Sequence, residues 1–111
     1  MDPLSKTTDF YCDFVFSGKV NVDKVKETNN VLAFYHTKPS YELHIVIVPK
    51  KHISTLSELD DLNVIKEIFM VTQQIIKEKK LDKSNFRIIT NGGSFQDSKH
   101  LHFHLVSGEK K

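Results

Sequence analysis

The segment His100-Leu101-His102-Phe103-His104-Leu105-Val106 alternates strictly between histidine and an apolar residue before its apolar end. Side chains on a β-strand point to opposite faces with a period of two, so this alternation predicts a strand with one buried face. Leu101, Phe103 and Leu105 are expected on the core side. The three histidines are expected together on the other face, with next-but-one neighbours about 7 Å apart.

Three neighbouring imidazoles support two kinds of chemistry, and the alternation alone does not distinguish them. Neutral imidazole is the commonest metal ligand, and a catalytic zinc site uses three protein ligands plus water. Alternatively, one histidine can attack a phosphoryl group and form a covalent intermediate, while its neighbours donate hydrogen bonds to the phosphate oxygens. An exposed strand face without either chemistry is the third interpretation.

The sequence before this segment predicts an α+β domain. Apolar side chains recur every three or four residues from Ile65 to Ile76, which indicates a helix that Asp60 or Asp61 caps and that ends near residues 81–82. Residues 11–16 are aromatic-rich and are expected to form a short helix or turn. Strands are expected at residues 20–28, 31–35, 43–48, 86–90 and 100–106. We therefore expect a mainly antiparallel sheet of about five strands, one long helix and a short N-terminal helix.

Length and composition indicate one globular domain over residues 1–111, with residues 1–9 polar and flexible. The chain is 39% hydrophobic and 27% charged, which is ordinary globular usage. It contains no apolar run long enough to cross a membrane and no apolar signal core at its N-terminus. We therefore expect a cytoplasmic protein without a membrane partner.

The charge of the chain argues against nucleic acid as a partner. The formal net charge is only +2, and Arg87 is the single arginine. A small net charge gives no strong attractive field, and base recognition relies heavily on arginine. The basic residues around Lys77 to Lys83 are expected to form a solvated helix end.

Three further segments carry motifs in a fixed order ahead of the histidines. They are Val31-Leu32-Ala33-Phe34, Leu43-His44-Ile45-Val46-Ile47-Val48-Pro49-Lys50-Lys51-His52-Ile53, and Ile88-Ile89-Thr90-Asn91-Gly92. Together with the terminal segment, they resemble the histidine-triad (HIT) nucleotide-binding family over roughly residues 12–108. The similarity is greatest to its Hint branch, which hydrolyses nucleoside phosphoramidates and aminoacyl-adenylates.

The resemblance implies a HIT-like fold and a role for each histidine. His102 matches the nucleophile, which would attack the α-phosphorus and form a nucleotidyl-histidine that water hydrolyses. His104 and His44 match residues that line the phosphate site, and His100 matches the residue that supports the orientation of the nucleophile. From its position alone, His44 is also explained as a polar residue at a strand start, and His52 is expected to be structural.

The resemblance also implies a binding site for a purine nucleotide similar to AMP. Asn91 matches a residue that contacts the ribose–phosphate region, and Phe34 matches part of the nucleoside pocket wall. A turn residue at Asn91 and plain core packing at Phe34 are the simpler explanations of these two positions.

Two positions depart from the family pattern within the implied nucleotide site. The Hint branch places a serine three residues before the first triad histidine, where it helps to protonate the leaving group. Asp97 stands at that position and Ser98 follows it, and the sequence does not show which one acts. His36 stands where the family carries an acidic residue that binds the ribose hydroxyls. An imidazole lacks the paired acceptors of a carboxylate, so altered ribose affinity is expected.

The resemblance further implies a homodimer and no cofactor. The family joins two sheets with the long helices paired, and such isologous association suits a small domain. Members with a structural zinc carry a cysteine pair near the N-terminus, whereas this chain has Cys12 and then Val15. We therefore expect no metal.

The sequence thus predicts a hydrolase of AMP-type nucleotides. The alternative is a nucleotide-binding interaction protein with little or no catalysis. A module that binds metal through His100, His102 and His104 is a third, weaker interpretation.

Overall fold

The computed structural model describes residues 11–111, which form five strands, one long helix and four short helical turns. The strands are β1 (Lys24–Glu27), β2 (Val31–Tyr35), β3 (Tyr41–Pro49), β4 (Arg87–Thr90) and β5 (Phe103–Lys110). The long helix is α1 (Leu62–Glu78), and the short turns are Tyr11–Val15, Leu56–Glu58, Leu81–Lys83 and Gly93–Phe95. Within the described residues, no helix is both long and apolar enough to cross a membrane.

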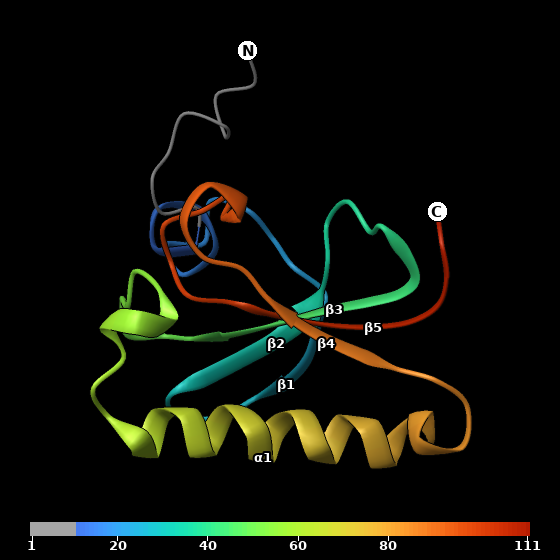
Figure 1. The fold of residues 1–111 in the computed structure, drawn as a ribbon. Coiled ribbons are helices and arrows are strands. Elements are labelled where there is room, and N and C mark those ends of the chain that lie inside the picture. Colours follow the sequence, from blue (N-terminus) through green and yellow to red (C-terminus); the bar gives the residue numbers. More distant parts are fainter. Residues whose placement is uncertain (1–10) are drawn as a thin grey trace.

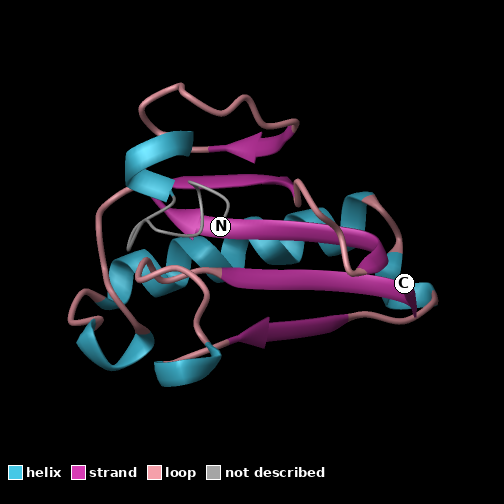
Figure 2. Ribbon diagram, turned by 90° about the horizontal axis from the view of Figure 1, so that it is seen from above, coloured by secondary structure: helices cyan, strands magenta, loops and turns pink. Residues whose placement is uncertain are grey.

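The five strands form a single antiparallel sheet in the order β1-β2-β3-β5-β4 (Figures 1 and 2). Strands β3 and β5 lie next to each other at its centre, and Ile45 is opposite Leu105 while Val46 is opposite His104. The expected α+β class, the five-stranded antiparallel sheet and the single long helix are therefore confirmed.

Each face of the sheet is covered by a different apolar layer. Helix α1 lies along one face (Figure 1), where Ile68, Val71 and Ile75 pack with side chains from β2, β3 and β5. The opposite face carries a second cluster, which comprises Tyr11, Val15, Leu32, Phe34, Val46 and Val48. Because strand side chains alternate, β2 and β3 contribute to both layers.

Helix α1 begins at the residue after Asp61, whose side chain accepts a hydrogen bond from the Asn63 backbone N–H at 2.9 Å. This N-cap confirms one of the two expected positions. The helix ends at Glu78, earlier than expected, because Lys80 adopts a left-handed conformation with φ of 58°. Residues 81–83 then form a separate short turn.

Several expected boundaries are wrong, and the last strand is the informative case. It begins at Phe103, so residues 100–102 lie outside the ladder. The Leu101 backbone N–H donates to Ile53 O at 2.6 Å, and His100 O accepts from the His102 ring at 2.8 Å. The alternation nevertheless holds, since Leu101 and Phe103 pack in the α1-side core.

The other strands and the N-terminal segment differ less. Strand β1 is shorter than expected, β3 extends two residues earlier and one later, and β4 begins one residue later. Residues 11–15 form a single helical turn, as expected for a short N-terminal helix. The expectation for residues 1–9 lies outside the described residues.

The α1-side core predicts that Ile68→Ala lowers the free energy of unfolding by about 2–5 kcal/mol, because the Ile68 side chain is fully buried and its loss leaves a cavity. The substitution Leu62→Ala serves as the control, since Leu62 belongs to the same helix and is 76% exposed. Urea denaturation followed by circular dichroism measures both. Equal losses for the two variants would contradict this description of the core.

Candidate active site

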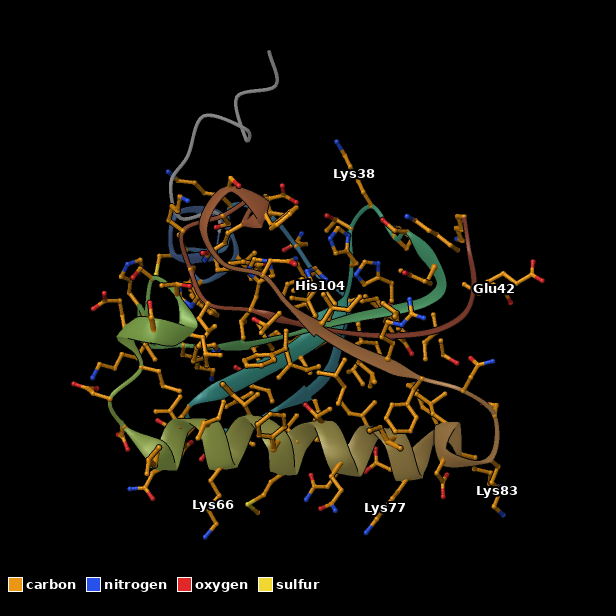
Figure 3. All side chains as sticks on the ribbon, in the orientation of Figure 1. Lys38, Glu42, Lys66, Lys77, Lys83 and His104 are labelled. Atoms are coloured by element: carbon orange, nitrogen blue, oxygen red, sulfur yellow. The ribbon has the colours of Figure 1, made fainter. Side chains whose placement is uncertain are left out.

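Four histidines lie along the face of the sheet opposite α1. His36 follows β2, His44 belongs to β3, His104 to β5, and His102 immediately precedes β5. His44 shares its face with Val46, which is opposite His104, and the His36 backbone N–H donates to His44 O at 2.9 Å. In Figure 3, His104 lies on the side of the strands away from α1.

The four rings form a continuous series. Ring centroids are 4.4 Å apart for His36 and His44, 4.9 Å for His44 and His104, and 5.0 Å for His104 and His102. The structure therefore brings together the three histidines that were expected around the phosphorus, His44, His102 and His104. It places His36 in contact with His44 at one end of the series.

Hydrogen bonds assign the proton of each ring in this series. The Lys38 backbone N–H donates to His36 Nδ1 at 2.9 Å, and the Ser40 backbone N–H donates to His44 Nδ1 at 3.0 Å. A backbone N–H can only donate, so both neutral rings carry their proton on Nε2. His44 Nε2–H then donates to His104 Nδ1 at 2.8 Å, which places the His104 proton on Nε2 as well.

His102 has the opposite tautomer. Its Nδ1 lies 2.8 Å from the carbonyl oxygen of His100, which can only accept. Nδ1 therefore carries the proton, and Nε2 keeps its lone pair. The backbone at this point is held from the other side, because Thr90 Oγ1 donates to His102 O at 2.9 Å.

Burial keeps these rings neutral. Burial, with a smaller contribution from neighbouring histidines, lowers the pKa of His44 to about 4 and that of His104 to about 3. Burial is also the main cause of the lowered pKa values of His36 and His102. Asp97 acts against the shift at these two rings, so its carboxylate lies close enough to affect both.

His100 is fully buried and lies apart from this series. Its Nε2–H donates to Pro49 O at 2.7 Å, and its Nδ1 lies 3.5 Å from the Cys12 sulfur. The Tyr11 ring contacts both His100 and His102, with centroid distances of 5.4 and 5.1 Å. The backbone oxygen of His100 thus accepts from His102, whereas its side chain contacts Pro49, Cys12 and Tyr11.

Cys12, His52 and His100 meet part of the requirement for a structural zinc. One ligand atom from each lies within 4.8 Å of the other two. Structural zinc sites are almost always four-coordinate, and this cluster of described residues offers three ligands. The donor set is thus one ligand short of a closed site, and the absence of a metal stays a prediction.

The remaining expected residues lie around the histidines. Phe34 is buried in the cluster on this face, 6.1 Å from the Tyr11 ring. Asn91 directly follows Thr90, which is opposite Phe103. Asp97 is exposed and Ser98 is buried, and both belong to the loop that leads into His100.

Sequence reasoning missed the contacts of Tyr11, Cys12 and His52 with His100. Cys12 and His100 are 88 residues apart in the chain, and local periodicity carries no information on such a pairing. The aromatic composition of residues 11–16 indicated packing on the core but not which ring would reach the triad. A bare exposed face for the three histidines is wrong, because His100 and His102 are buried.

Comparison with known proteins matches this arrangement to one family. The HIT domain model matches residues 17–111. The chain belongs to the HIT family. A solved histidine triad protein from Clostridium difficile is 37% identical, with a TM-score of 0.82 over 93% of this chain and 92% of that one. The HIT-like fold expected from the sequence is therefore confirmed.

Two further solved HIT structures are similar to this chain. A HIT family hydrolase from Legionella pneumophila is 27% identical, with a TM-score of 0.82 over 92% of this chain and 94% of that one. A histidine triad nucleotide-binding protein from Candida albicans is 28% identical, with a TM-score of 0.77 over 87% and 72% of the two chains.

The lowered histidine pKa values predict that acid destabilises the fold. Unfolded histidine titrates near 6.5, so the unfolded chain binds more protons than the folded one between about pH 4 and 6.5. Stability therefore falls as the pH drops from 7 to 5, by up to about 2 kcal/mol for each of His44 and His104. Urea midpoints at the two pH values measure this. The double variant His44→Gln/His104→Gln should show a clearly weaker dependence, and an unchanged one would contradict the assignment.

Proposed function

We propose that this HIT protein is a hydrolase of the Hint type, which cleaves AMP-type phosphoramidates and adenylates through a nucleotidyl-histidine intermediate on His102. The resemblance of the sequence to the Hint branch motivates the substrate class. The Legionella relative is described as a hydrolase and the Candida relative as nucleotide-binding, which supports both parts of the proposal.

The observation that carries the proposal is the hydrogen bond from His102 Nδ1–H to His100 O. It leaves a lone pair on Nε2, and the lowered pKa keeps that atom unprotonated at neutral pH. A nucleophilic histidine requires both conditions, because a protonated imidazole cannot attack. The acceptor nitrogens of His36, His44 and His104 each receive a hydrogen bond. Among the described residues, no donor to His102 Nε2 is found, so this nitrogen is available for attack.

In the proposed reaction, His102 Nε2 attacks the α-phosphorus, and the bond from phosphorus to the leaving nitrogen or acyl oxygen breaks. An amine leaving group takes a proton as it departs, for which Asp97 and Ser98 remain the two candidates. Water then attacks the phosphorus of the nucleotidyl-histidine and releases AMP. In this second step the bond between phosphorus and His102 Nε2 breaks, and its electron pair returns to Nε2. The proton of the attacking water passes to solvent.

His104 and His44 have different parts in this reaction. His104 Nε2–H is the donor that faces a phosphoryl oxygen, where negative charge grows as the nucleophile attacks. His44 donates to His104 Nδ1 and thereby fixes which nitrogen of His104 carries the proton. His44 is thus a positioning residue. No step requires a metal.

The purine nucleoside is assigned to the apolar cluster beside the histidines. Phe34, Tyr11, Val46 and Val48 are buried in this cluster, so the nucleoside has to open its edge in order to bind. Asn91 would meet the ribose–phosphate region from the end of β4. Apolar walls with a few polar groups are typical of nucleotide pockets.

His102→Asn is expected to lower turnover of an adenosine phosphoramidate by about a thousandfold or more, with AMP binding retained. Asparagine keeps a polar side chain but has no nucleophilic nitrogen. His100→Asn should slow turnover only about tenfold to a hundredfold, because His100 orients the nucleophile. Turnover is measured after treatment with chelator, and mass spectrometry after a rapid quench that avoids acid locates the adduct.

Three results would count against this assignment. They are full activity in His102→Asn, an adduct on His100 or His104, and loss of wild-type activity on chelation that zinc restores.

One observation favours a nucleotide-binding protein with weak catalysis as the second candidate. His102 is only 5% exposed, and the Tyr11 ring packs against it, so a substrate must displace or slide past this ring. Binding of AMP without measurable turnover of any phosphoramidate would favour this candidate over the hydrolase.

We also propose that the protein is a homodimer formed through β4 and α1. Strand β4 is an edge of the sheet, so its backbone is available to pair with a second copy. Next to it lies an apolar hollow of about 580 Å³ whose lining includes Phe69, Met70, Phe86 and Ile88. These four side chains are 39–50% exposed, and exposed apolar surface of this kind is typical of interfaces.

Met70→Lys is expected to shift the protein to monomers, because it places a charge in this hollow. Leu62→Lys is the matched control, since Leu62 is also an exposed apolar residue of α1 but does not line the hollow. Sedimentation velocity on both variants and the wild-type protein gives the masses. A wild-type monomer, or an unchanged dimer in Met70→Lys, would rule out this interface.

A further inference from the structure

His36, His44 and His104 could be taken for a metal site from distances alone, since one ring nitrogen from each lies within 4.8 Å of the other two. Their hydrogen bonds argue otherwise. A ring that binds a metal through Nε2 carries its proton on Nδ1 and donates from there to an acceptor. Here, Nδ1 of His36 and of His44 each face a backbone N–H. If Nε2 bound a metal, the ring proton would move to Nδ1. At both rings, Nδ1–H would then face a backbone N–H, and two donors would oppose each other.

The same bonds make the cluster a source of donors. His44 uses its Nε2–H on His104. Within residues 11–111, the Nε2–H groups of His36 and His104 therefore stay available to a ligand. Two such N–H groups suit a ligand with acceptor oxygens, and they do not suit a metal cation. The centroids of these two rings are 6.0 Å apart and the rings are nearly parallel, at 29°.

We propose that His36 binds the phosphoryl group of the substrate, together with His104. This inference rests on the proposed function. It adds the Nε2–H of His36 to that of His104 as a second hydrogen-bond donor in the phosphate site. It assigns His36 to the oxyanion rather than to a pair of sugar hydroxyls.

The choice between these two ligands follows from proton accounting. A hydroxyl that accepts from His36 Nε2–H still has its own proton to place, and the second nitrogen of His36 already accepts from Lys38 N–H. A phosphoryl oxygen has no proton to place and offers free lone pairs. His36 therefore satisfies an oxyanion completely and a hydroxyl pair only in part.

Charge points the same way. Burial is the main cause of the lowered pKa of His36, and a bound anion would oppose that shift because it favours the protonated ring. In Figure 3 the Lys38 side chain extends from the β2–β3 loop away from His104. The contribution of Lys38 to the site is its backbone N–H, which donates to His36 Nδ1.

The test compares AMP, adenosine and inorganic phosphate as probes for the wild-type protein and for His36→Asp, by calorimetry and by competition with phosphate. A carboxylate at this position repels a phosphoryl group but accepts from hydroxyls. We expect AMP affinity to fall about tenfold or more, competition by phosphate to weaken in parallel, and adenosine affinity to change less than twofold. Thr37→Asp is the matched control, because it adds the same charge at the next, exposed residue, and we expect a smaller loss of AMP affinity.

The opposite pattern would overturn the proposal. Tighter binding of both AMP and adenosine to His36→Asp would assign His36 to the sugar, and equal losses for the two probes would assign it to the nucleoside. Stoichiometric zinc binding that is lost in His36→Asn would make the cluster a metal site. If His36→Asp does not fold, the ratio of AMP to adenosine affinity in His36→Gln and His36→Ala decides. The amide of glutamine can still donate, so only alanine should lower that ratio.

This test is separable from the test of the hydrolase. A wild-type protein that binds AMP but does not turn over phosphoramidates refutes the hydrolase and leaves the His36 comparison intact. A protein with normal turnover whose AMP and phosphate affinities ignore His36→Asp refutes only the assignment of His36.

Discussion

The central pairing of β3 with β5 is the constraint on which the site depends. Its register places Ile45 opposite Leu105 against α1, and it places Val46 opposite His104 on the other face. A slip of one residue would turn His104 into the α1-side core and expose Leu105. The free energy of burying the apolar face therefore fixes the alignment of the histidines, although no histidine contributes to that core.

The sequence allowed much of this arrangement to be predicted, for physical reasons that can be named. Alternation specifies which residues share a face, so Leu101 and Leu105 were expected together in the core and His104 on the other side. The period of three to four residues specified α1, and Asp61 specified its start. These features depend only on neighbours a few residues away.

The rest could not be predicted because it depends on contacts between distant segments. The proton positions of His36 and His44 are fixed by backbone N–H groups of a loop whose bend the sequence does not reveal. The shell around His100 comes from residues near the N-terminus. Strand β5 begins only at Phe103, since the His102 ring donates to the backbone oxygen of His100. Strand propensity does not describe a bond of this kind between a side chain and the backbone.

The bond between His102 and His100 O has a mechanical consequence. The ring and its acceptor belong to residues two apart in the chain, so they form a small closed unit that moves as one piece when the sheet flexes. His36 and His44, in contrast, take their orientation from the loop between β2 and β3. The proposed attack and the proposed phosphate binding thus depend on separate parts of the molecule. A disturbance of that loop would disorder His36 and His44, while His102 would keep the tautomer that the proposed attack requires.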